Sequence, residues 1–381
     1  MIYLDNAATS FPKPSVVVEA VCKQMTEVGG NAGRSSHQGG LQSGRILYET
    51  RCAIAEIINC GDPMEISFTL NATEGLNTVI QGALEAGDHV VTTSMEHNSV
   101  LRPLVALENR QVSHTIVWGD GEGLIDPLDM EKAIQPNTRL MVVNHCSNVT
   151  GGVQPLEALA KVAQKHRLLI LVDASQSCGS LPLDVETLQI DFLAAPGHKA
   201  LFGPQGTGIL YINKKNKIRA LKQGGTGSRS EDLHQPEIIP DYYESGTQNV
   251  HGLAGLKAGA IFVMEQGVEF IHAHEKRIIE QLWEGLSVIQ GIQLFGPPPG
   301  EHRGSVVSFR GKDMDVNQMN YALDITCGIS ARAGLHCAPL AHQTLGTFPE
   351  GTIRFSPGFF TTRAEIDQVL AGVNRVMKEL A

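Results

Sequence analysis

The chain has 381 residues and a formal net charge of −10, with 42% hydrophobic and 18% charged residues. This composition is typical of a soluble globular protein. The negative charge argues against nucleic acid or an anionic membrane as the main partner. No apolar run approaches the roughly 20 residues that a membrane span needs. The opening MIYLDNAATSF lacks the basic and apolar regions of a secretory signal. We therefore expect a cytoplasmic protein with no nucleic-acid or membrane partner.

The seven cysteines are scattered along the chain and form no CxxC pair. This pattern disfavours a zinc site and a disulfide framework, and it fits a reducing compartment. We predict no metal site and expect at most one or two chemically active cysteines.

Short apolar or β-branched runs alternate with helical patterns between about residues 65 and 215. The predicted strands in this region are Asp88–Thr93, Ser113–Trp118, Leu140–His145, Leu168–Asp173, Asp191–Ala195 and Gly208–Ile212. Pro155–Arg167 is a typical helical stretch between two of them, with leucines at helical spacing. Such alternation predicts an α/β fold whose mostly parallel sheet is covered on both faces.

Residues 222–250 break this rhythm, because they are rich in Gly, Pro, Ser and charge, and they predict a long loop. A helical stretch over about 252–290 follows. The pattern after it predicts a smaller α+β part, made of the strands Gly304–Arg310 and Gly351–Ser356, the helix Val316–Cys327 and a closing helix from Arg363. We predict a large domain over 15–255, and a small domain over 256–381 that also includes 1–14.

Polar residues follow four of the predicted strands, where ligands bind in open α/β sheets. They are His97, Asn148, Asp173 with Gln176, and Lys199. A lysine and a carboxylate at neighbouring strand ends suit pyridoxal 5′-phosphate (PLP), which needs an amine for its aldehyde and an acid beside its ring nitrogen. Gln176 could bond the ring hydroxyl, and His97 could stack on the ring. Each residue alone also has an ordinary structural explanation, as a turn, cap or surface residue.

A phosphate group needs main-chain N–H groups at the start of a helix. The sequence Asn71-Ala72-Thr73-Glu74 matches a helix N-terminus, with Asn71 as the cap and Glu74 three residues later. Ala72 and Thr73 are therefore candidate phosphate ligands.

The motifs resemble those of the class V aminotransferase family, and within it the cysteine desulfurases and selenocysteine lyases. The matching segments, in the family's order, are YLDNAATS at 3–10, NATEGLN at 71–77, MEHNS at 95–99, NHCSNVTG at 144–151, VDASQS at 172–177, GHKALFGPQGTGILY at 197–211, ESGTQN at 244–249, RAGLHCA at 332–338 and TIRFSPGFFTT at 352–362. The resemblance runs nearly end to end. It implies the type I fold of PLP enzymes and a homodimer with active sites at the subunit interface.

The resemblance also implies roles for single residues. It makes Lys199 the lysine that holds PLP, Asp173 the partner of the ring nitrogen, and Cys337 the cysteine that accepts sulfur. Further roles are ring stacking by His97, a ring-hydroxyl contact by Gln176, phosphate binding by Thr73, His198 and, across the dimer interface, Thr247, a cofactor and substrate contact by Asn148, and a clamp on the substrate carboxylate by Arg354. His336 and Arg332 lie near Cys337 in sequence and could help it.

This chain departs from the family's pattern at several positions. Pro196 stands where a serine often binds the phosphate, and it has neither a hydroxyl nor an N–H. Phe360 and Thr361 replace a Tyr-Asn pair in the tail, and Leu335 replaces a common histidine.

The expected activity is conversion of L-cysteine to L-alanine with a persulfide left on Cys337, from which a sulfur-acceptor protein could take it. Lyase activity on selenocysteine, or on another β-substituted amino acid, is an alternative, since selenium can leave without an attacking thiol. A true aminotransferase and a non-catalytic PLP-binding scaffold are further alternatives.

Overall fold

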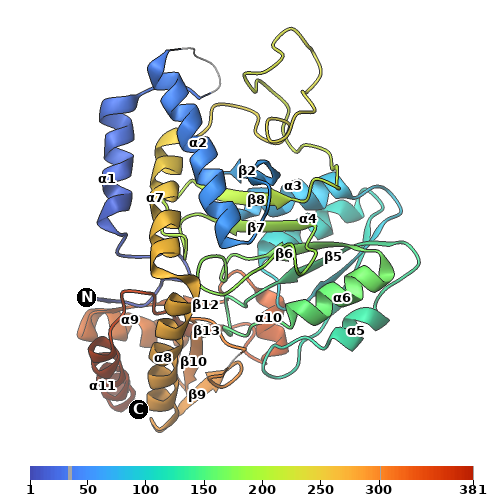
Figure 1. The fold of residues 1–381 in the computed structure, drawn as a ribbon. Helices are drawn as coiled ribbons and strands as arrows, with labels where there is room; N and C mark the ends of the chain where they lie inside the picture. Colours follow the sequence, from blue (N-terminus) through green and yellow to red (C-terminus); the bar gives the residue numbers. More distant parts are fainter. Residues whose placement is uncertain (33–36, 301, 381) are drawn as a thin grey trace.

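The computed structural model of the chain describes residues 1–32, 37–300 and 302–380. Its centre is a seven-stranded sheet with the order β2-β8-β7-β6-β5-β3-β4 (Figure 1). These strands are β2 (Ile66–Thr69), β3 (His89–Thr93), β4 (Ser113–Val117), β5 (Thr138–Asn144), β6 (Leu169–Asp173), β7 (Phe192–Pro196) and β8 (Gly208–Ile212). Strand β8 runs antiparallel to both of its neighbours, β2 and β7, and the other pairings of this sheet are parallel, so the predicted mostly parallel sheet is confirmed.

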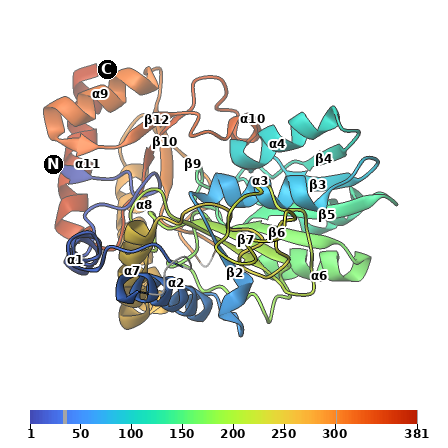
Figure 2. The ribbon, with the colours of Figure 1, turned by 90° about the horizontal axis from the view of Figure 1, so that it is seen from above.

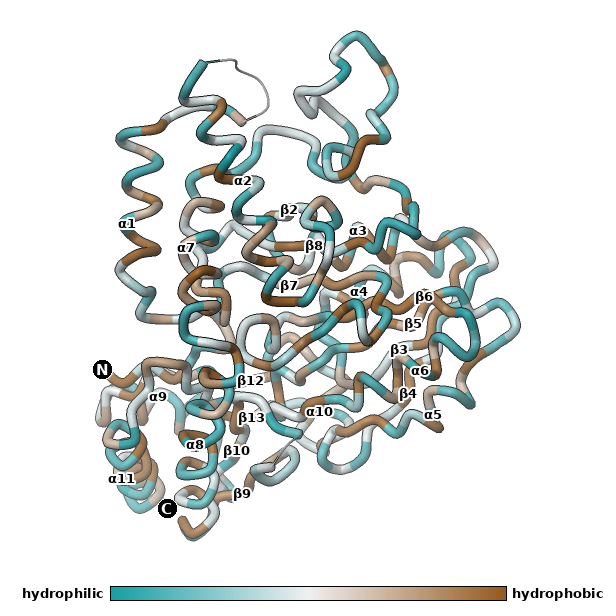
Figure 3. The backbone as a smooth tube through the Cα atoms, viewed as in Figure 1, coloured by the Kyte–Doolittle hydropathy of each residue, from teal (hydrophilic) through white to brown (hydrophobic). Residues whose placement is uncertain are grey.

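Helices cover both faces of this sheet, as the view from above shows (Figure 2). One face carries α3 (Ala72–Ala83) and α4 (Asn98–Glu108), and the other carries α2 (Gln38–Ile57), α5 (Pro127–Lys132), α6 (Leu156–His166) and α7 (Val250–Gln266). Neighbouring strand residues such as Val90 and Val91 belong to the apolar clusters on opposite faces. The strands of the sheet are accordingly among the most hydrophobic segments (Figure 3).

A second, antiparallel sheet with the order β12-β13-β10-β9 forms the core of the C-terminal part. Its strands are β9 (Ile292–Phe295), β10 (Val307–Gly311), β12 (Arg332–Gly334) and β13 (Thr352–Phe355). The helices of this part are α8 (Val268–Ser287), α9 (Val316–Cys327), α10 (Pro339–Thr344) and α11 (Arg363–Leu380). The N-terminal strand β1 (Ile2–Tyr3) pairs with β11 (Ile329–Ser330), so both termini lie beside this part (Figure 1). The predicted smaller α+β part is confirmed.

The structure adds details that the sequence did not reveal. The predicted helical stretch over 252–290 consists of two helices, α7 and α8, separated at Gly267, whose φ of +84° suits glycine. Helix α1 (Ser15–Lys23), the π-turn Gln24–Val28 and the 3₁₀ turn Pro63–Glu65 complete the order. The short strands β2, β9 and β12, of three or four residues each, were not predicted.

Separate apolar clusters fill the two faces of the seven-stranded sheet. A further cluster joins Ile2 and Leu4 to α8, α9, α11 and the second sheet. The domain division at 255 and 256 stays a prediction, and that position lies within α7. Residues 213–249 contain no helix or strand, which agrees with the predicted loop. Among the described residues, no helix is long and apolar enough to cross a membrane.

Candidate active site

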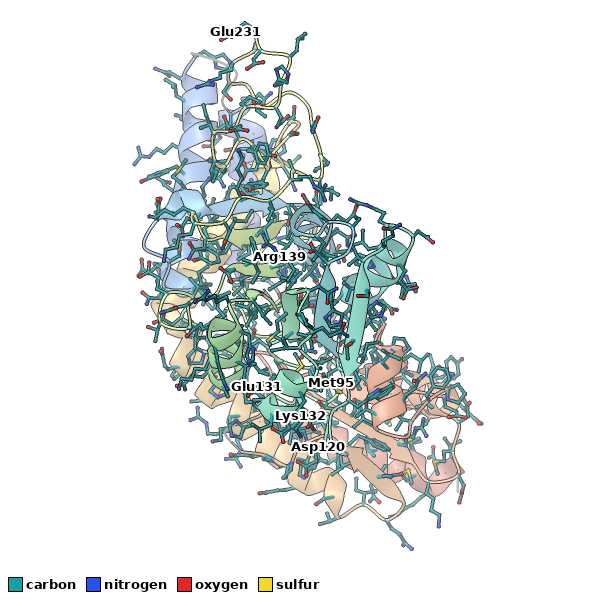
Figure 4. All side chains as sticks on the ribbon, turned by 90° about the vertical axis from the view of Figure 1, so that its right-hand side faces the viewer. Met95, Asp120, Glu131, Lys132, Arg139 and Glu231 are labelled. Carbon is teal, nitrogen blue, oxygen red and sulfur yellow. The ribbon has the colours of Figure 1, made fainter. Side chains whose placement is uncertain are left out.

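Polar residues converge on a cavity at the carboxyl ends of β2, β3, β5, β6 and β7. The cavity contains about 560 Å³ of empty space, part of which is open to solvent. It is lined by Asn71, Ala72, Thr73, Leu76, His97, Ser99, Asn144, Cys146, Asn148, Asp173, Ser175, Gln176, Pro196, His198 and Lys199. Eight predicted site residues therefore share one cavity. Met95, labelled in Figure 4, lies close to where this edge of the sheet meets the C-terminal part.

Lys199 follows β7 after a tight turn. The turn requires Gly197, because a Cβ there would lie 2.3 Å from the Thr207 hydroxyl. Burial lowers the pKa of Lys199 to about 8, against the opposing pull of the Asp173 carboxylate. An amine with a lowered pKa carries a free lone pair in a larger fraction of molecules near neutral pH than an ordinary lysine does. Lys199 is therefore suited to attack an aldehyde.

Asp173 is the last residue of β6 and is 5% exposed. Its Oδ1 accepts a hydrogen bond from the Ser175 N–H at 2.9 Å, which fixes the carboxyl group at the cavity wall. The pairing of Asn144 with Asp173 across β5 and β6 sets the position of both residues. Asp173 can therefore present a negative charge to a cationic ring nitrogen.

His97 caps the N-terminus of α4. Its Nδ1 accepts the N–H of Ser99 at 3.0 Å, so the neutral imidazole carries its proton on Nε2. Burial lowers the pKa of His97. A neutral ring of this kind is suited to stacking against a flat ligand.

The N-terminus of α3 forms the expected anion-binding end of the cavity. Asn71 accepts the N–H of Glu74 at 3.0 Å, so the predicted cap is confirmed. The Glu74 carboxylate accepts instead from the N–H of Leu70, one residue before the cap, at 2.6 Å. The first helical residues, Ala72 and Thr73, line the cavity. Their position suits an anion, because a helix N-terminus offers N–H groups and a positive dipole end.

Two further cavity residues form hydrogen bonds with the N-terminal segment. The Gln176 amide donates to the main-chain oxygen of Ala7 at 3.0 Å. Lys13 donates to the main-chain oxygen of His198 at 2.8 Å. Burial, together with the nearby charges of Lys199 and Lys13, lowers the pKa of His198 to about 4, so its ring is neutral.

Arg354 lies on β13 and is 1% exposed. Its Nη2 donates to Asp5 Oδ1 at 2.8 Å, and its Nη1 donates to the Asn148 main-chain oxygen at 3.0 Å. Its Nε is buried and has no partner among the described residues. The Asn148 amide donates in turn to the His336 main-chain oxygen at 2.7 Å. An unpartnered buried donor on a guanidinium suits an acidic ligand.

Cys337 is exposed in the turn between β12 and α10. His336 and Cys337 both have positive φ, +48° and +60°, which is uncommon for residues with a side chain. The turn is held beside His97, because the N–H of Asn98 donates to the Cys337 main-chain oxygen at 2.8 Å. The Arg332 Nη2 lies 3.5 Å from the Cys337 sulfur. Arg332 is thus the neighbour that contacts the thiol.

The His336 ring instead contacts Thr352, with its Nε2 3.1 Å from the main-chain oxygen of that residue. Burial lowers the pKa of His336 well below its ordinary value. His336 therefore has no visible part in activating the sulfur.

Thr247 is the one predicted cofactor residue that the structure does not bring to the cavity of its own chain. It is exposed in the loop that precedes α7. Sequence reasoning also left two residues at the site without roles, Asp5 and Ser99. Both lie inside matched motifs, YLDNAATS and MEHNS, and their positions in those motifs were the only signal available.

The chain matches the class-V aminotransferase family over residues 2–369. It belongs to this family. A probable cysteine desulfurase of Methanothermobacter thermautotrophicus is 36% identical over 371 residues, covering 96% of this chain and 92% of that protein. The predicted family membership is confirmed.

Solved structures give the same result. The apo cysteine desulfurase of Thermococcus onnurineus is 32% identical with a TM-score of 0.93, and the match covers 99% of this chain and 95% of that one. The cysteine desulfurase CsdA of Escherichia coli, in an S-sulfonic acid form, is 27% identical with a TM-score of 0.88, covering 100% of this chain and 95% of that one. The predicted type I fold of PLP enzymes is confirmed.

Proposed function

We propose that this chain is a PLP-dependent cysteine desulfurase, which converts L-cysteine to L-alanine and holds the sulfur as a persulfide on Cys337. One observation carries the proposal: Lys199, Asp173 and His97 line one cavity, and main-chain bonding holds the Cys337 turn beside His97. The full-length similarity to cysteine desulfurases supports the same activity.

The residues of the cavity fit PLP. The α3 N-terminus with Ala72 and Thr73 suits the phosphate, Asp173 suits the ring nitrogen, and Lys199 suits the aldehyde. His198 Nδ1 is buried without a hydrogen-bond partner among the described residues. This nitrogen is therefore available to bind a polar group of the cofactor. PLP, when bound, supplies the electron-accepting ring that makes the substrate Cα proton acidic.

The chain's own residues then divide the remaining work. Arg354 and Asn148 bind the substrate carboxylate and amino acid backbone, and the lowered pKa of Lys199 lets its amine remove and return a proton at Cα. The Cys337 sulfur forms a bond to the substrate sulfur while the Cβ–S bond breaks. The electron pair of that bond stays with the carbon skeleton, which takes up a proton and leaves as alanine. No external oxidant or reductant is needed.

We also propose a cytoplasmic homodimer in which Thr247 contacts the phosphate held by the second copy. The exposure of Thr247 supports this, since a residue that serves another subunit has to be accessible on its own chain. A sulfur-acceptor protein that approaches the exposed Cys337 would complete the cycle. We retain the division into 15–255 and 256–381 with 1–14 as part of the proposal.

The test is alanine release by purified, PLP-supplied protein given L-cysteine, for wild type, Cys337→Ala and Lys199→Ala. Wild type should release alanine, and both variants should lose the activity. Selenocysteine separates the alternatives, because Cys337→Ala should keep selenium release. If Cys337→Ala desulfurates cysteine as fast as wild type, the sulfur-acceptor role is wrong. If wild type forms alanine only with an added keto acid, it is an aminotransferase.

A further inference from the structure

Ser99 lies at the centre of a chain of hydrogen bonds on one wall of the cavity. It is in the first turn of α4 and is 8% exposed. Its Oγ lies 2.7 Å from Thr73 Oγ1 and 2.9 Å from His97 Nδ1. The three side chains come from two helix N-termini, and all of them line the cavity. Ser99 thus joins the anion-binding end of α3 to the imidazole of His97.

The directions of these bonds follow from the Ser99 main chain. Because the Ser99 N–H points at His97 Nδ1, that nitrogen carries no proton and accepts. The Ser99 hydroxyl can donate its single proton to the same nitrogen, sharing the one lone pair with the Ser99 N–H, and its oxygen can then accept from the Thr73 hydroxyl. When an anion binds at α3, the Thr73 hydroxyl can turn to it while Ser99 remains bonded to His97.

The end of β7 contributes no hydroxyl to the cavity. Pro196 ends β7 and lines the cavity, and it has neither an N–H nor a hydroxyl. Thr73, Ser99 and Ser175 are the hydroxyl-bearing residues that line the cavity, and of these only Thr73 belongs to the first turn of α3.

We propose that Ser99 is a positioning residue that holds the His97 imidazole as its Nε2–H form and aligns the Thr73 hydroxyl for the phosphate of the cofactor. This inference rests on the proposed function for the identity of the anion. The role of Ser99 in holding the His97 imidazole does not depend on that function. The alternative is that Ser99 serves only to start α4. That role requires no contact with Thr73, so it does not explain the 2.7 Å hydrogen bond between the two hydroxyls.

The charged groups around His97 have to be considered with it. Asp173 raises the pKa of His97, while Lys199, Arg332 and Arg102 lower it. None of these groups changes when the Ser99 hydroxyl is removed. A change in the pKa of His97 in a Ser99 variant therefore reports the loss of the hydrogen bond between Ser99 and His97.

The test compares Ser99→Ala with Ser99→Thr, which keeps a hydroxyl, and with Ser287→Ala, a control at an exposed position on α8. The first readout is the ¹⁵N signal of His97 in histidine-labelled protein without cofactor, assigned with His97→Gln. Wild type should show the Nε2–H form. Ser99→Ala should raise the proton affinity of His97 by about threefold to tenfold, the range of one hydrogen bond. Ser99→Thr and Ser287→Ala should match wild type.

The second readout is the dissociation constant of PLP, which Ser99→Ala should raise by about threefold to tenfold. Unchanged His97 signals together with an unchanged PLP constant in a folded Ser99→Ala protein would overturn the inference. If wild type fails to bind PLP, the proposed function fails, and the His97 signals still decide whether Ser99 holds the imidazole.

Discussion

Arg354 and Asp5 form an ion pair at 2.8 Å between residues 349 positions apart in the chain. Burial lowers the pKa of the Arg354 guanidinium, and Asp5 is the first of the groups that raise it again. Asp5 thus compensates the buried charge and, together with the Asn148 main-chain oxygen, fixes the direction of the guanidinium. The N-terminal segment thereby orients the residue that we propose as the carboxylate clamp.

Asp5→Ala should weaken both stability and substrate binding. Removing one partner of a fully buried pair costs about 3–5 kcal/mol. Because the Asp5 side chain keeps 23% of its surface exposed, the loss in free energy of unfolding should be smaller than this. Urea unfolding and the KM for cysteine measure the two effects. Asp5→Asn is the control, since its amide oxygen can still accept from Arg354. The ion pair would have no positioning role if Asp5→Ala left KM at the wild-type value.

Arg332 should govern how fast Cys337 reacts with iodoacetamide. Its guanidinium lies 3.5 Å from the sulfur and can donate a hydrogen bond that orients the sulfur toward a reagent. We expect Arg332→Met to slow alkylation of Cys337 by about fivefold or more. Mass spectrometry can follow Cys337 and the exposed Cys22 in the same sample, and the rate at Cys22 should stay constant. Equal rates at Cys337 in both proteins would remove Arg332 from the activation of the thiol.

The reaction of PLP with Lys199 should depend on pH with a midpoint near the lysine's pKa of about 8. The unprotonated amine reacts, so the rate should rise with pH and level off above that value. Asp173 raises the pKa of Lys199, so Asp173→Asn should move the midpoint to lower pH. Stopped-flow visible absorbance of the cofactor measures both profiles, with Lys199→Ala as the blank. A midpoint above 10 would mean that burial does not act on this amine.

Much of this site could be predicted from sequence because the polar residues directly follow strands. Asp173 ends a strand with a clear apolar pattern, and Lys199 and His97 follow two others. Parallel strands bring their carboxyl ends to one edge. The order of the strands was hidden, because β2 is short and nothing in its four residues shows that β8 separates it from β7.

Other contacts could not be predicted because they join segments far apart in the chain. Asp5 reaches Arg354 only through the pairing of Asp5 with Ser356 beside β13, and Ser99 reaches Thr73 only because α3 and α4 start side by side. The direction of a side chain was equally hidden. Arg332 and His336 were equal candidates beside Cys337, and the positive φ at His336 accompanies a ring that is buried against Thr352.

A buried ion pair anchors the loop that carries Thr247. Arg51 on α2 and Glu244 are 5% and 6% exposed and form two bonds, at 2.6 and 2.7 Å. Glu244 also accepts the N–H of Phe68 in the edge strand β2, over whose ring the guanidinium lies at 4.3 Å. The end of the loop is therefore fixed to the sheet three residues before Thr247.

Glu244→Ala should leave the Arg51 charge buried without its partner and should lower the free energy of unfolding by about 3–5 kcal/mol. The matched control is Glu157→Ala, which breaks the exposed pair with Lys161 on α6 and should cost at most about 1 kcal/mol. The double variant Arg51→Met with Glu244→Leu should recover part of the loss, since no unpaired charge remains. Urea unfolding of wild type, the two single variants and the double variant measures these free energies. A loss for Glu244→Ala no larger than that for Glu157→Ala would show that the loop is held by its other contacts.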